Sequence, residues 1–256
     1  MKLGFTVLAL MAAAPVLAEA QGGTEQPREA KRVTVEDLKT ILTRGTTEQL
    51  DNLLNHGIAA DTRVGKEAMP LLVMAAYTGR VEMVHTILKH GADPNASQKP
   101  GISALSVAAA TNNAHMLDLL LAHGADKNFR ALQGDSVLML ACSQNALDTI
   151  QLLLASKADP NLADANGVTP LIYSIARCQE PHVVSLMLLE HGADPNARMK
   201  DGTTALIAAA MRNNVECTRQ LLRYGADVSA RDAEGHSARE VAKNPEIQKL
   251  LDAATP

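Results

Sequence analysis

The chain has 256 residues, of which 46% are hydrophobic, 2% are aromatic and none is tryptophan. This hydrophobic share excludes a disordered chain, and the scarcity of aromatic residues predicts a core of Leu, Ala, Val, Ile and Met. The formal net charge of −4 leaves no basic excess to neutralise phosphates, which argues against nucleic-acid binding.

The N-terminus has the pattern of an export signal. Lys2 supplies a positive charge, residues 3–16 form a short apolar stretch, and 18–20 read Ala-Glu-Ala, a cleavage site. We therefore expect residues 1–20 to be a signal peptide and the mature chain to start at Gln21. A buried N-terminal helix or a retained membrane anchor is the alternative, but the stretch is short for a span of about 20 residues. The form of the signal predicts a periplasmic protein with no stable membrane anchor after cleavage.

Residues 21–32 are polar, contain Gly and Pro, and are typical of a flexible leader. Helical patterning starts at Val33. The segment 33–64 predicts a pair of helices joined by a tight turn at Gly45, with the character of a terminal cap.

A short phrase then recurs along the chain: HGADPN, HGADKN, SKADPN, HGADPN and YGADVS. Successive copies are 33, 33, 35 and 33 residues apart, measured at equivalent positions: Gly91, Gly124, Lys157, Gly192 and Gly225. A period near 33 residues predicts stacked helical repeats, so most of the chain is one solenoid.

Each repeat follows the same order of signals. A Gly turn precedes a Ser or Thr whose hydroxyl can cap a helix start, at Ser103, Ser136, Thr169 and Thr204. A short Ala-rich inner helix follows, then a polar turn, then a Leu-rich outer helix that ends at Gly or a polar residue. The Asp and Asn after that end predict an extended tip, because their side chains bond nearby backbone.

These residues resemble the ankyrin-repeat family, whose signature includes Thr-Pro-Leu at a helix start, as at 169–171, and Leu-Leu-x-x-Gly-Ala-Asp-x-Asn after the second helix. The resemblance implies an all-α solenoid of stacked helix-turn-helix units with extended hairpin tips over residues 33–252, followed by a tail at 253–256. We expect about seven units, including terminal caps, with boundaries at 33–64, 65–97, 98–130, 131–163, 164–198, 199–231 and 232–252.

The sequence departs from the family pattern in four respects. The usual His after Pro-Leu is absent, so the loop hydrogen bonds that it lends must come from elsewhere; its positions hold Ser106, Met139, Ile172 and Ile207. Two extra residues fall around 178–180, and one extra residue is expected within 69–79. Ser156 and Lys157 replace His-Gly in the fourth unit.

Two repeated columns could suggest chemistry. His56, His90, His123 and His191 precede the helix-ending position in four units, but repeats about 10 Å apart cannot bring two imidazoles to one zinc ion with bonds of about 2.1 Å. We interpret them as histidines favoured at helix C-termini. The Asp of each phrase recurs in every unit and is interpreted as a turn residue. We expect no metal, no cofactor and no enzymatic activity.

Three cysteines are present, at 142, 178 and 217. An oxidising compartment would allow one disulfide and leave one thiol over. The register places Cys142 on an inner helix and Cys217 on an outer helix at core positions, and places Cys178 in a loop, where exposure is expected. Whether any two of them pair stays open.

The resemblance implies a protein-binding surface formed by the tips and the inner helices, where residues vary between repeats. The expected partner-binding residues are Tyr77, Lys99, Phe129, Arg130, Leu132, Gln144, Arg177, Arg198, Met199, Lys200, Arg212 and Arg231. Met211 falls on the same surface. Arg and aromatic residues are enriched at binding hot spots, and the cluster of Arg198, Lys200, Arg212 and Arg231 is locally basic in an acidic protein.

We therefore expect a monomeric, non-catalytic module that binds another protein in the periplasm. Similarity to exported bacterial ankyrin-repeat proteins suggests support of a periplasmic enzyme, for example in peroxide defence. Neutralisation of a delivered toxin, as an immunity protein, and a structural scaffold role are the alternatives.

Overall fold

The computed structural model describes residues 33–99, 101–177 and 181–254. The predicted signal peptide, the predicted leader and Cys178 lie outside these residues. The chain divides into two compact units, Met1–Asp93 and Pro94–Pro256.

The first unit holds two helix pairs and one short hairpin. Helix α2 packs on α4 and α3 packs on α5. The hairpin pairs Arg63 with Pro70 and Val64 with Met69 in antiparallel register. The elements are α2 (Val35–Arg44), α3 (Thr47–Asn55), β1 (Arg63–Val64), β2 (Met69–Pro70), α4 (Leu71–Tyr77) and α5 (Val81–Lys89).

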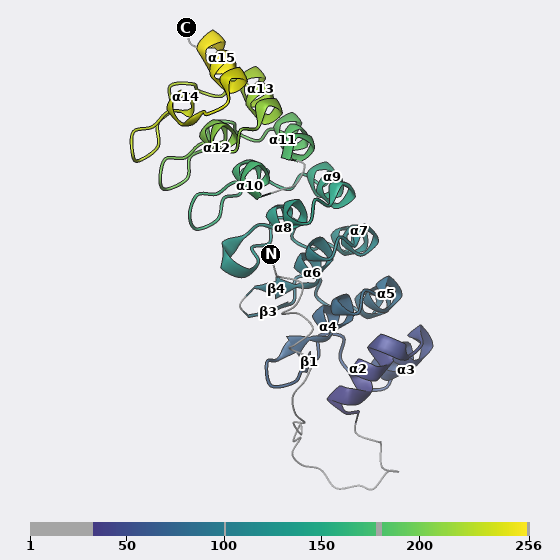
Figure 1. Ribbon diagram of the computed structural model, residues 1–256. Helices are drawn as coiled ribbons and strands as arrows, with labels where there is room; N and C mark the ends of the chain where they lie inside the picture. The colour runs from purple at the N-terminus through teal and green to yellow at the C-terminus, as the bar shows by residue number, and fades with distance from the viewer. Residues whose placement is uncertain (1–32, 100, 178–180, 255–256) are drawn as a thin grey trace, which may run out of the picture. The chain divides into compact units, whose positions relative to one another are not determined.

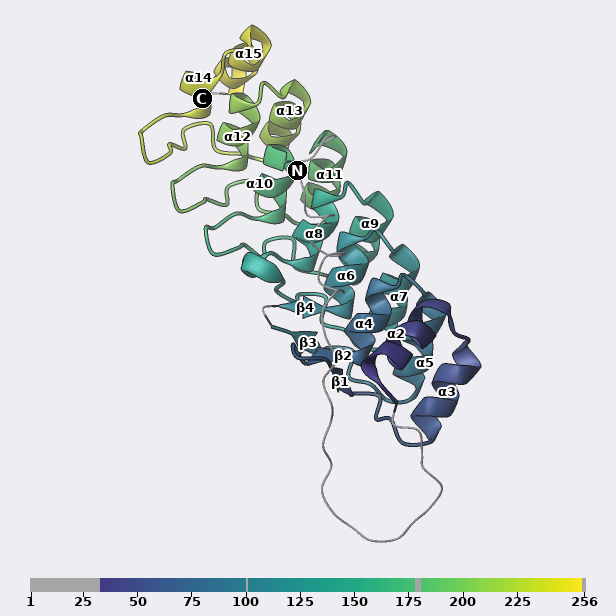
Figure 2. The same ribbon diagram turned by 60° about the horizontal axis from the view of Figure 1, so that its bottom comes forward.

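The second unit repeats a hairpin followed by an inner and an outer helix. The hairpins of this unit extend from one side of its helix pairs in both ribbon views (Figures 1 and 2). Inner helices are α6 (Ala104–Ala110), α8 (Val137–Ser143), α10 (Pro170–Arg177), α12 (Ala205–Met211) and α14 (Ala238–Val241). Outer helices are α7 (Ala114–Ala122), α9 (Leu147–Ala155), α11 (Pro181–Glu190), α13 (Val215–Arg223) and α15 (Pro245–Ala254).

Two layers follow from this order, because inner helices pack on inner helices and outer helices on outer helices. The core lies between the layers. Small side chains let the inner helices approach closely, as in α6, where residues from Ala104 to Ala109 are buried, and in α12, where Ala205 to Ala210 are buried. The expected helical solenoid is confirmed, with short strands added in its hairpins.

The predicted helix starts are confirmed by their hydrogen bonds. The hydroxyl oxygens of Ser103, Ser136 and Thr204 each accept from the backbone N–H three residues on, at 3.1, 3.2 and 3.3 Å. Thr169 does the same for Ile172 at 3.3 Å. Each bond satisfies a donor that a helix start leaves without a partner.

The hairpins share one register with one exception. Antiparallel pairs form between residues six apart, as in Ser97 with Ser103 and Arg130 with Ser136, whereas Arg63 pairs with Pro70, seven residues on. The extra residue expected within 69–79 therefore lies in the first hairpin instead, where Ala68 has a φ of 49°. The interval from the helix cap to the turn residue of positive φ is then the same in four repeats, whose turn residues are Gly79, Asn112, Asn145 and Asn213.

The two extra residues around 178–180 coincide with longer flanking helices. Helix α10 has 8 residues and α11 has 10, whereas α8 and α9 have 7 and 9. Hairpin β3 (Ser97–Gln98) with β4 (Ile102–Ser103), together with the short 3-10 helix η1 (Leu132–Gly134), completes the described elements of the second unit.

A ladder of amides ties consecutive repeats of the second unit together. Asn161 illustrates it: its side-chain oxygen accepts from the N–H of Asp194 at 2.7 Å, and its amide donates to the carbonyl of Gly192 at 3.0 Å. Asn95 and Asn196 make the equivalent pairs of bonds with the following repeats. In four of the five phrases the Asp carboxylate accepts from the backbone N–H two residues on, at Asp126, Asp159, Asp194 and Asp227. The repeated Asp residues are therefore turn residues, as expected.

The histidine column is also used inside the fold. In His56, His123 and His191 the ring Nδ1 lies 2.7, 2.9 and 2.8 Å from the carbonyl oxygen four residues back. Because a carbonyl can only accept, Nδ1 is the protonated nitrogen in this geometry. These side chains bond to carbonyls of the last helical turn, two of which, those of Asn52 and Leu119, also accept from the backbone N–H of the same histidine. This agrees with the interpretation as C-terminal histidines.

Candidate protein-binding surface

The arginines expected at the hairpin tips of the second unit bond to backbone carbonyls. The Nη1 of Arg130 donates to Gly134 at 3.1 Å in its own hairpin and to Ala163 at 2.6 Å in the next. Arg198 donates to the carbonyl of Arg231 in the next hairpin. These guanidinium groups supply loop hydrogen bonds of the kind that the missing histidines would have lent.

Arg231 is engaged further. Its Nη1 donates to the carbonyl of Gly235 at 2.5 Å and lies 2.8 Å from Oε2 of Glu240. Glu240 also accepts from the N–H and hydroxyl of Ser237, at 2.6 and 2.8 Å. The backbone N–H and the hydroxyl of Ser237, with the cation of Arg231, lower the pKa of Glu240 to about 2. In the predicted basic cluster, Arg198 and Arg231 thus hold hairpins through hydrogen bonds. Lys200 is exposed on a hairpin, and Arg212 is exposed at the end of an inner helix.

The remaining predicted tip residues differ in exposure. Phe129 and Met199 are half-buried, and Lys99 is exposed. Leu132, in η1, is 38% exposed, which makes it the most exposed large apolar side chain among the described hairpin residues. The tips thus offer separate, scattered side chains to a partner, while their arginine side chains are largely engaged in hydrogen bonds of the fold.

The ends of the inner helices are the other predicted part of the surface. Gln144, Arg177 and Arg212 occupy the same position of consecutive repeats, eight residues after the helix cap, and all are exposed. Tyr77 is the last residue of α4 in the first unit, one position earlier in its repeat; it is half-buried, and burial raises the pKa of its hydroxyl. Met211, next to Arg212, is 61% exposed.

Sequence reasoning missed two residues on this side. Leu140 of α8 and Tyr173 of α10 are half-buried, four residues after the caps Ser136 and Thr169. Residues four apart share one helix face, so Tyr173 lies on the face of Arg177 and Leu140 on the face of Gln144. The signal was available in the helical period, but these positions look like ordinary core residues in the letters alone. We call Leu140, Tyr173, Arg177, Met211 and Arg212 the inner-helix surface.

Two guanidinium groups belong to this surface, those of Arg177 and Arg212. Among the residues that the structure describes, they make neither a hydrogen bond nor an ion pair through their side chains. The charge of Arg177 does reach Asp135, a half-buried residue of the preceding hairpin. Burial, together with the charge of Asp164, raises the pKa of Asp135, and Arg177 opposes this shift.

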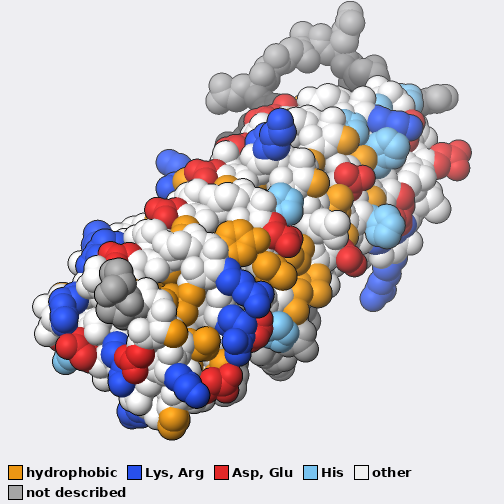
Figure 3. All heavy atoms as spheres, turned by 90° about the horizontal axis from the view of Figure 1, so that it is seen from above, with side chains coloured by type: hydrophobic (Ala, Val, Ile, Leu, Met, Phe, Trp, Pro, Cys, Tyr) orange, Lys and Arg blue, Asp and Glu red, His pale blue; other side chains and the backbone are white. Residues whose placement is uncertain are grey.

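Charges are distributed unequally between the two helix layers of the second unit. The inner helices α6, α8, α10 and α12 contain no Asp or Glu, whereas each outer helix from α7 to α13 contains one: Asp118, Asp148, Glu190 and Glu216. Figure 3 shows a face on which hydrophobic, basic and acidic side chains are interspersed with several His side chains, which in this chain belong mostly to the outer helices and their ends. The inner helices α6 to α12 thus carry no acidic side chain, whereas the last inner helix, α14, carries Glu240.

Comparison with known proteins places this architecture. A model of ankyrin repeats in three copies matches residues 72–164, 105–199, 138–232 and 176–251, which together cover more than half of the chain. The chain belongs to the ankyrin-repeat family. Such repeats are protein-interaction modules.

Solved ankyrin structures superpose over most of the chain. The ankyrin repeat domain of Bcl-3 is 28% identical, with a TM-score of 0.76, and the match covers 84% of this chain and 97% of that one. The ankyrin repeat domain of human ASB11 shares the fold at 24% identity, with a TM-score of 0.70 over 86% of this chain and 97% of that one.

Sequence relatives match only in segments. Potassium channel AKT1 of Oryza sativa subsp. indica is 36% identical over 67 residues, and the B-cell lymphoma 3 protein homolog of Mus musculus is 33% identical over 86 residues. These matches cover 25% and 34% of this chain but only 7% and 19% of the relatives. These matches agree with the ankyrin assignment. They cover too little of each relative to carry over the activity of the whole protein.

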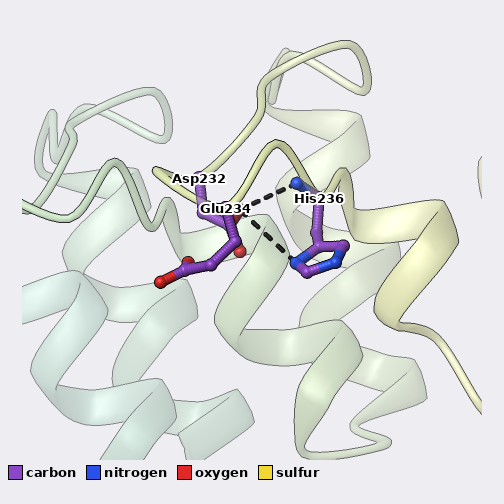
Figure 4. A group of neighbouring side chains, drawn as sticks. All are labelled: Asp232, Glu234 and His236. Carbon is purple, nitrogen blue, oxygen red and sulfur yellow. Dashed lines mark hydrogen bonds and ion pairs between the residues drawn. The ribbon is translucent and has the colours of Figure 1, made fainter.

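One ankyrin hairpin brings together three groups of the kind that bind metals. Ligand atoms of Asp232, Glu234 and His236 all lie within 4.8 Å of one another (Figure 4). Asp232 already accepts from the backbone N–H of His236 at 2.8 Å, as Asp164 accepts from Val168 in an equivalent hairpin. This is the turn chemistry of the repeat, and we assign no ligand to it.

The two cysteines that the structure describes are buried. Cys142 and Cys217 are both 0% exposed, and neither forms a disulfide within the described residues. Burial raises the pKa of Cys217 to about 11, against a weaker opposing effect of its contact with the Ser185 hydroxyl. A thiol with this pKa is almost entirely protonated near neutral pH and so is a poor nucleophile. The predicted core role of these two residues agrees with their burial.

Two open depressions lie elsewhere on the ankyrin units. One, of about 480 Å³, lies on the outer side of the second unit between Leu121 and Ser156, with Asp118 and Asp126 at its edge. The other, of about 350 Å³, is lined by residues of α2, α3 and the adjoining His56. Among the described residues, none of the helices is both long and apolar enough to cross a membrane.

Proposed function

We propose that this ankyrin chain is an exported binding module, which acts in the periplasm by docking another protein on its hairpins and inner helices. The observation that carries the docking site is the inner-helix surface, where Arg177, Met211 and Arg212 are exposed and the two arginine side chains make no hydrogen bond or ion pair among the described residues. The N-terminal pattern supports export. A preformed surface on packed helices favours binding because little ordering entropy is lost on docking.

Two biological roles are compatible with this proposal. The partner could be a periplasmic enzyme that the module supports, for example in peroxide defence, or a delivered toxin that it occludes. A scaffold role through the outer helices is the third hypothesis. The identity of the partner separates them, since each role requires a different class of protein on the surface.

Affinity capture from periplasmic extract tests the proposal. The exported protein is immobilised beside two variants, Arg177→Glu with Arg212→Glu, and Arg223→Glu as a matched control. Arg223 is also an exposed arginine without a side-chain partner among the described residues, but it ends outer helix α13. We expect one stoichiometric protein that is lost only from the double variant.

A partner lost only from the Arg223→Glu variant would move the site to the outer layer and support the scaffold hypothesis. The export proposal has its own test, the mass of the N-terminal peptide of the purified protein. We expect this peptide to start at Gln21. An uncleaved protein that still begins at residue 1 and is found in membrane fractions would contradict export with cleavage.

A further inference from the structure

The inner-helix surface combines apolar side chains with two arginines, which lie at the C-terminal ends of neighbouring inner helices. Tyr173 and Arg177 lie one turn apart on α10, and Met211 and Arg212 end the neighbouring helix α12, which packs on α10. Leu140 belongs to α8, which packs on the other side of α10. Apolar side chains of three adjacent repeats therefore line a strip that two guanidinium groups border.

Most other arginines of the second unit have a partner in the fold. Arg219 and Arg239 lie 3.1 and 2.6 Å from the carboxylates of Glu246 and Asp252, and Arg231 pairs with Glu240. Arg130 and Arg198 bind carbonyls. Within the described residues, Arg177 and Arg212 have neither kind of partner, which they share with Arg223 of outer helix α13, but only these two lie beside inner helices α6 to α12, on which no Asp or Glu occurs.

A partner segment that matches this surface must complement both properties. Carboxylates pair with guanidinium groups more strongly than other side chains do, since two parallel hydrogen bonds add to the charge attraction. Binding is favoured when a large apolar group buries the exposed Met211 side chain and the half-buried Tyr173 ring, because apolar surface is removed from water. Arg177 and Arg212 are too few, in an acidic chain, for a phosphate backbone.

We propose that the segment recognised here is an acidic stretch of a partner protein that carries a large apolar side chain. Its apolar side chain lies on Tyr173 and Met211, and its carboxylates pair with Arg177 and Arg212. This inference rests on the proposed function and adds the chemistry of the partner. The hairpin arginines Arg198 and Arg231, which the sequence places in the same cluster, are secondary because the fold already uses them.

Selection of peptides tests this chemistry without knowledge of the natural partner. Random dodecapeptides displayed on phage are selected on the immobilised full chain, and the affinity of each enriched peptide is measured by fluorescence anisotropy. We expect enriched peptides to share Asp or Glu flanking a Leu, Phe or Met. The variant Arg177→Glu with Arg212→Glu should weaken their binding by about tenfold or more, while Arg223→Glu leaves it within about twofold. Rising salt should weaken binding to the wild type.

Three results would overturn the inference. Enriched peptides without acidic residues, or peptides whose affinity the double variant leaves unchanged, would show that this surface does not select carboxylates. A failure to enrich any peptide on the wild type over the double variant counts equally against it. None of these results touches the capture experiment, in which a stoichiometric partner bound through other residues would still support a binding module.

Discussion

The asparagine ladder and the inner-helix surface are built on the same repeat but obey opposite rules. In the ladder the same residue recurs at Asn95, Asn161 and Asn196, and each side chain bonds to the next repeat. On the inner-helix surface the residue differs between the earlier and the later repeats, with Thr111 and Gln144 at the position that holds Arg177 and Arg212, and these two arginines bond to nothing in the described part of the chain. Repetition thus marks positions that hold the solenoid together, and variation at exposed positions marks those left for a partner.

Removal of one ladder residue should give the largest loss of stability among the following changes. Asn161→Ala deletes two hydrogen bonds between repeats, and we expect the free energy of unfolding to fall by about 2 kcal/mol. Urea unfolding followed by circular dichroism measures it. Asn166→Ala is the matched control: its backbone carbonyl accepts from Lys200 N–H, but its side chain has no partner among the described residues. Equal effects of the two variants would contradict the structural role of the ladder.

Restoring the glycine of the repeated phrase at Lys157 should stabilise the protein. Lys157 has a φ of 62°, in a position where Gly192 has 86°. A side chain is strained in this left-handed region, although glycine costs more entropy on folding. Lys157→Gly should therefore raise the free energy of unfolding by about 0.5–1 kcal/mol, and Gly192→Lys should lower it by a similar amount. The same denaturation series measures both, and a loss of stability on Lys157→Gly would be contrary evidence.

A smaller, pH-dependent effect is expected at the C-terminal repeat. The pKa of Glu240 is lowered from 4.5 to about 2, so its contribution to stability is fully present above about pH 4.5 and is lost as the pH falls toward 2. Glu240→Gln keeps an acceptor for Ser237 but removes the charge. We expect the variant to be less stable than wild type at neutral pH and to lose less stability on acidification. Thermal melts between these pH values check it, and parallel curves for the two proteins would argue against the ion pair.

Substitution of a hairpin arginine should cost more stability than substitution of an arginine of the inner-helix surface. Arg198→Ala removes a bond to the next hairpin, and we expect a loss of about 1 kcal/mol. Arg212→Ala removes no such bond and should change stability by less than about 0.5 kcal/mol. Denaturation curves of the two variants, side by side, make the comparison. A larger loss for Arg212→Ala would mean that the inner-helix surface is structural.

Much of the fold was predictable because helix caps, turns and periods are local signals. Ser103 and Thr204 cap the helices that their positions predicted, and the equivalent positions of Gly91 and Gly124 share a positive φ. The extra residue of the first hairpin was misplaced because the letters do not show whether a loop or a helix absorbs it. The structure fixes it at the hairpin through the pairing of Arg63 with Pro70.

The candidate site was harder to predict, since it depends on where long side chains end. Nothing in the sequence tells whether an arginine at a tip reaches outward or bends to a carbonyl 33 residues away, as Arg130 does. Leu140 and Tyr173 were missed because their exposure depends on how the neighbouring helices and hairpins pack. The position of Arg212 was predictable from the register alone, because it follows directly on a short helix.

The most direct test of the central claim is a comparison of affinities for the captured partner by titration calorimetry. The wild type, the variant Arg177→Glu with Arg212→Glu, and the variant Arg223→Glu are titrated under the same conditions. We expect the double variant to lose about tenfold or more in affinity while its unfolding curve and the affinity of the control stay unchanged. Equal affinities for all three proteins, or a loss confined to Arg223→Glu, would contradict docking on the inner-helix surface.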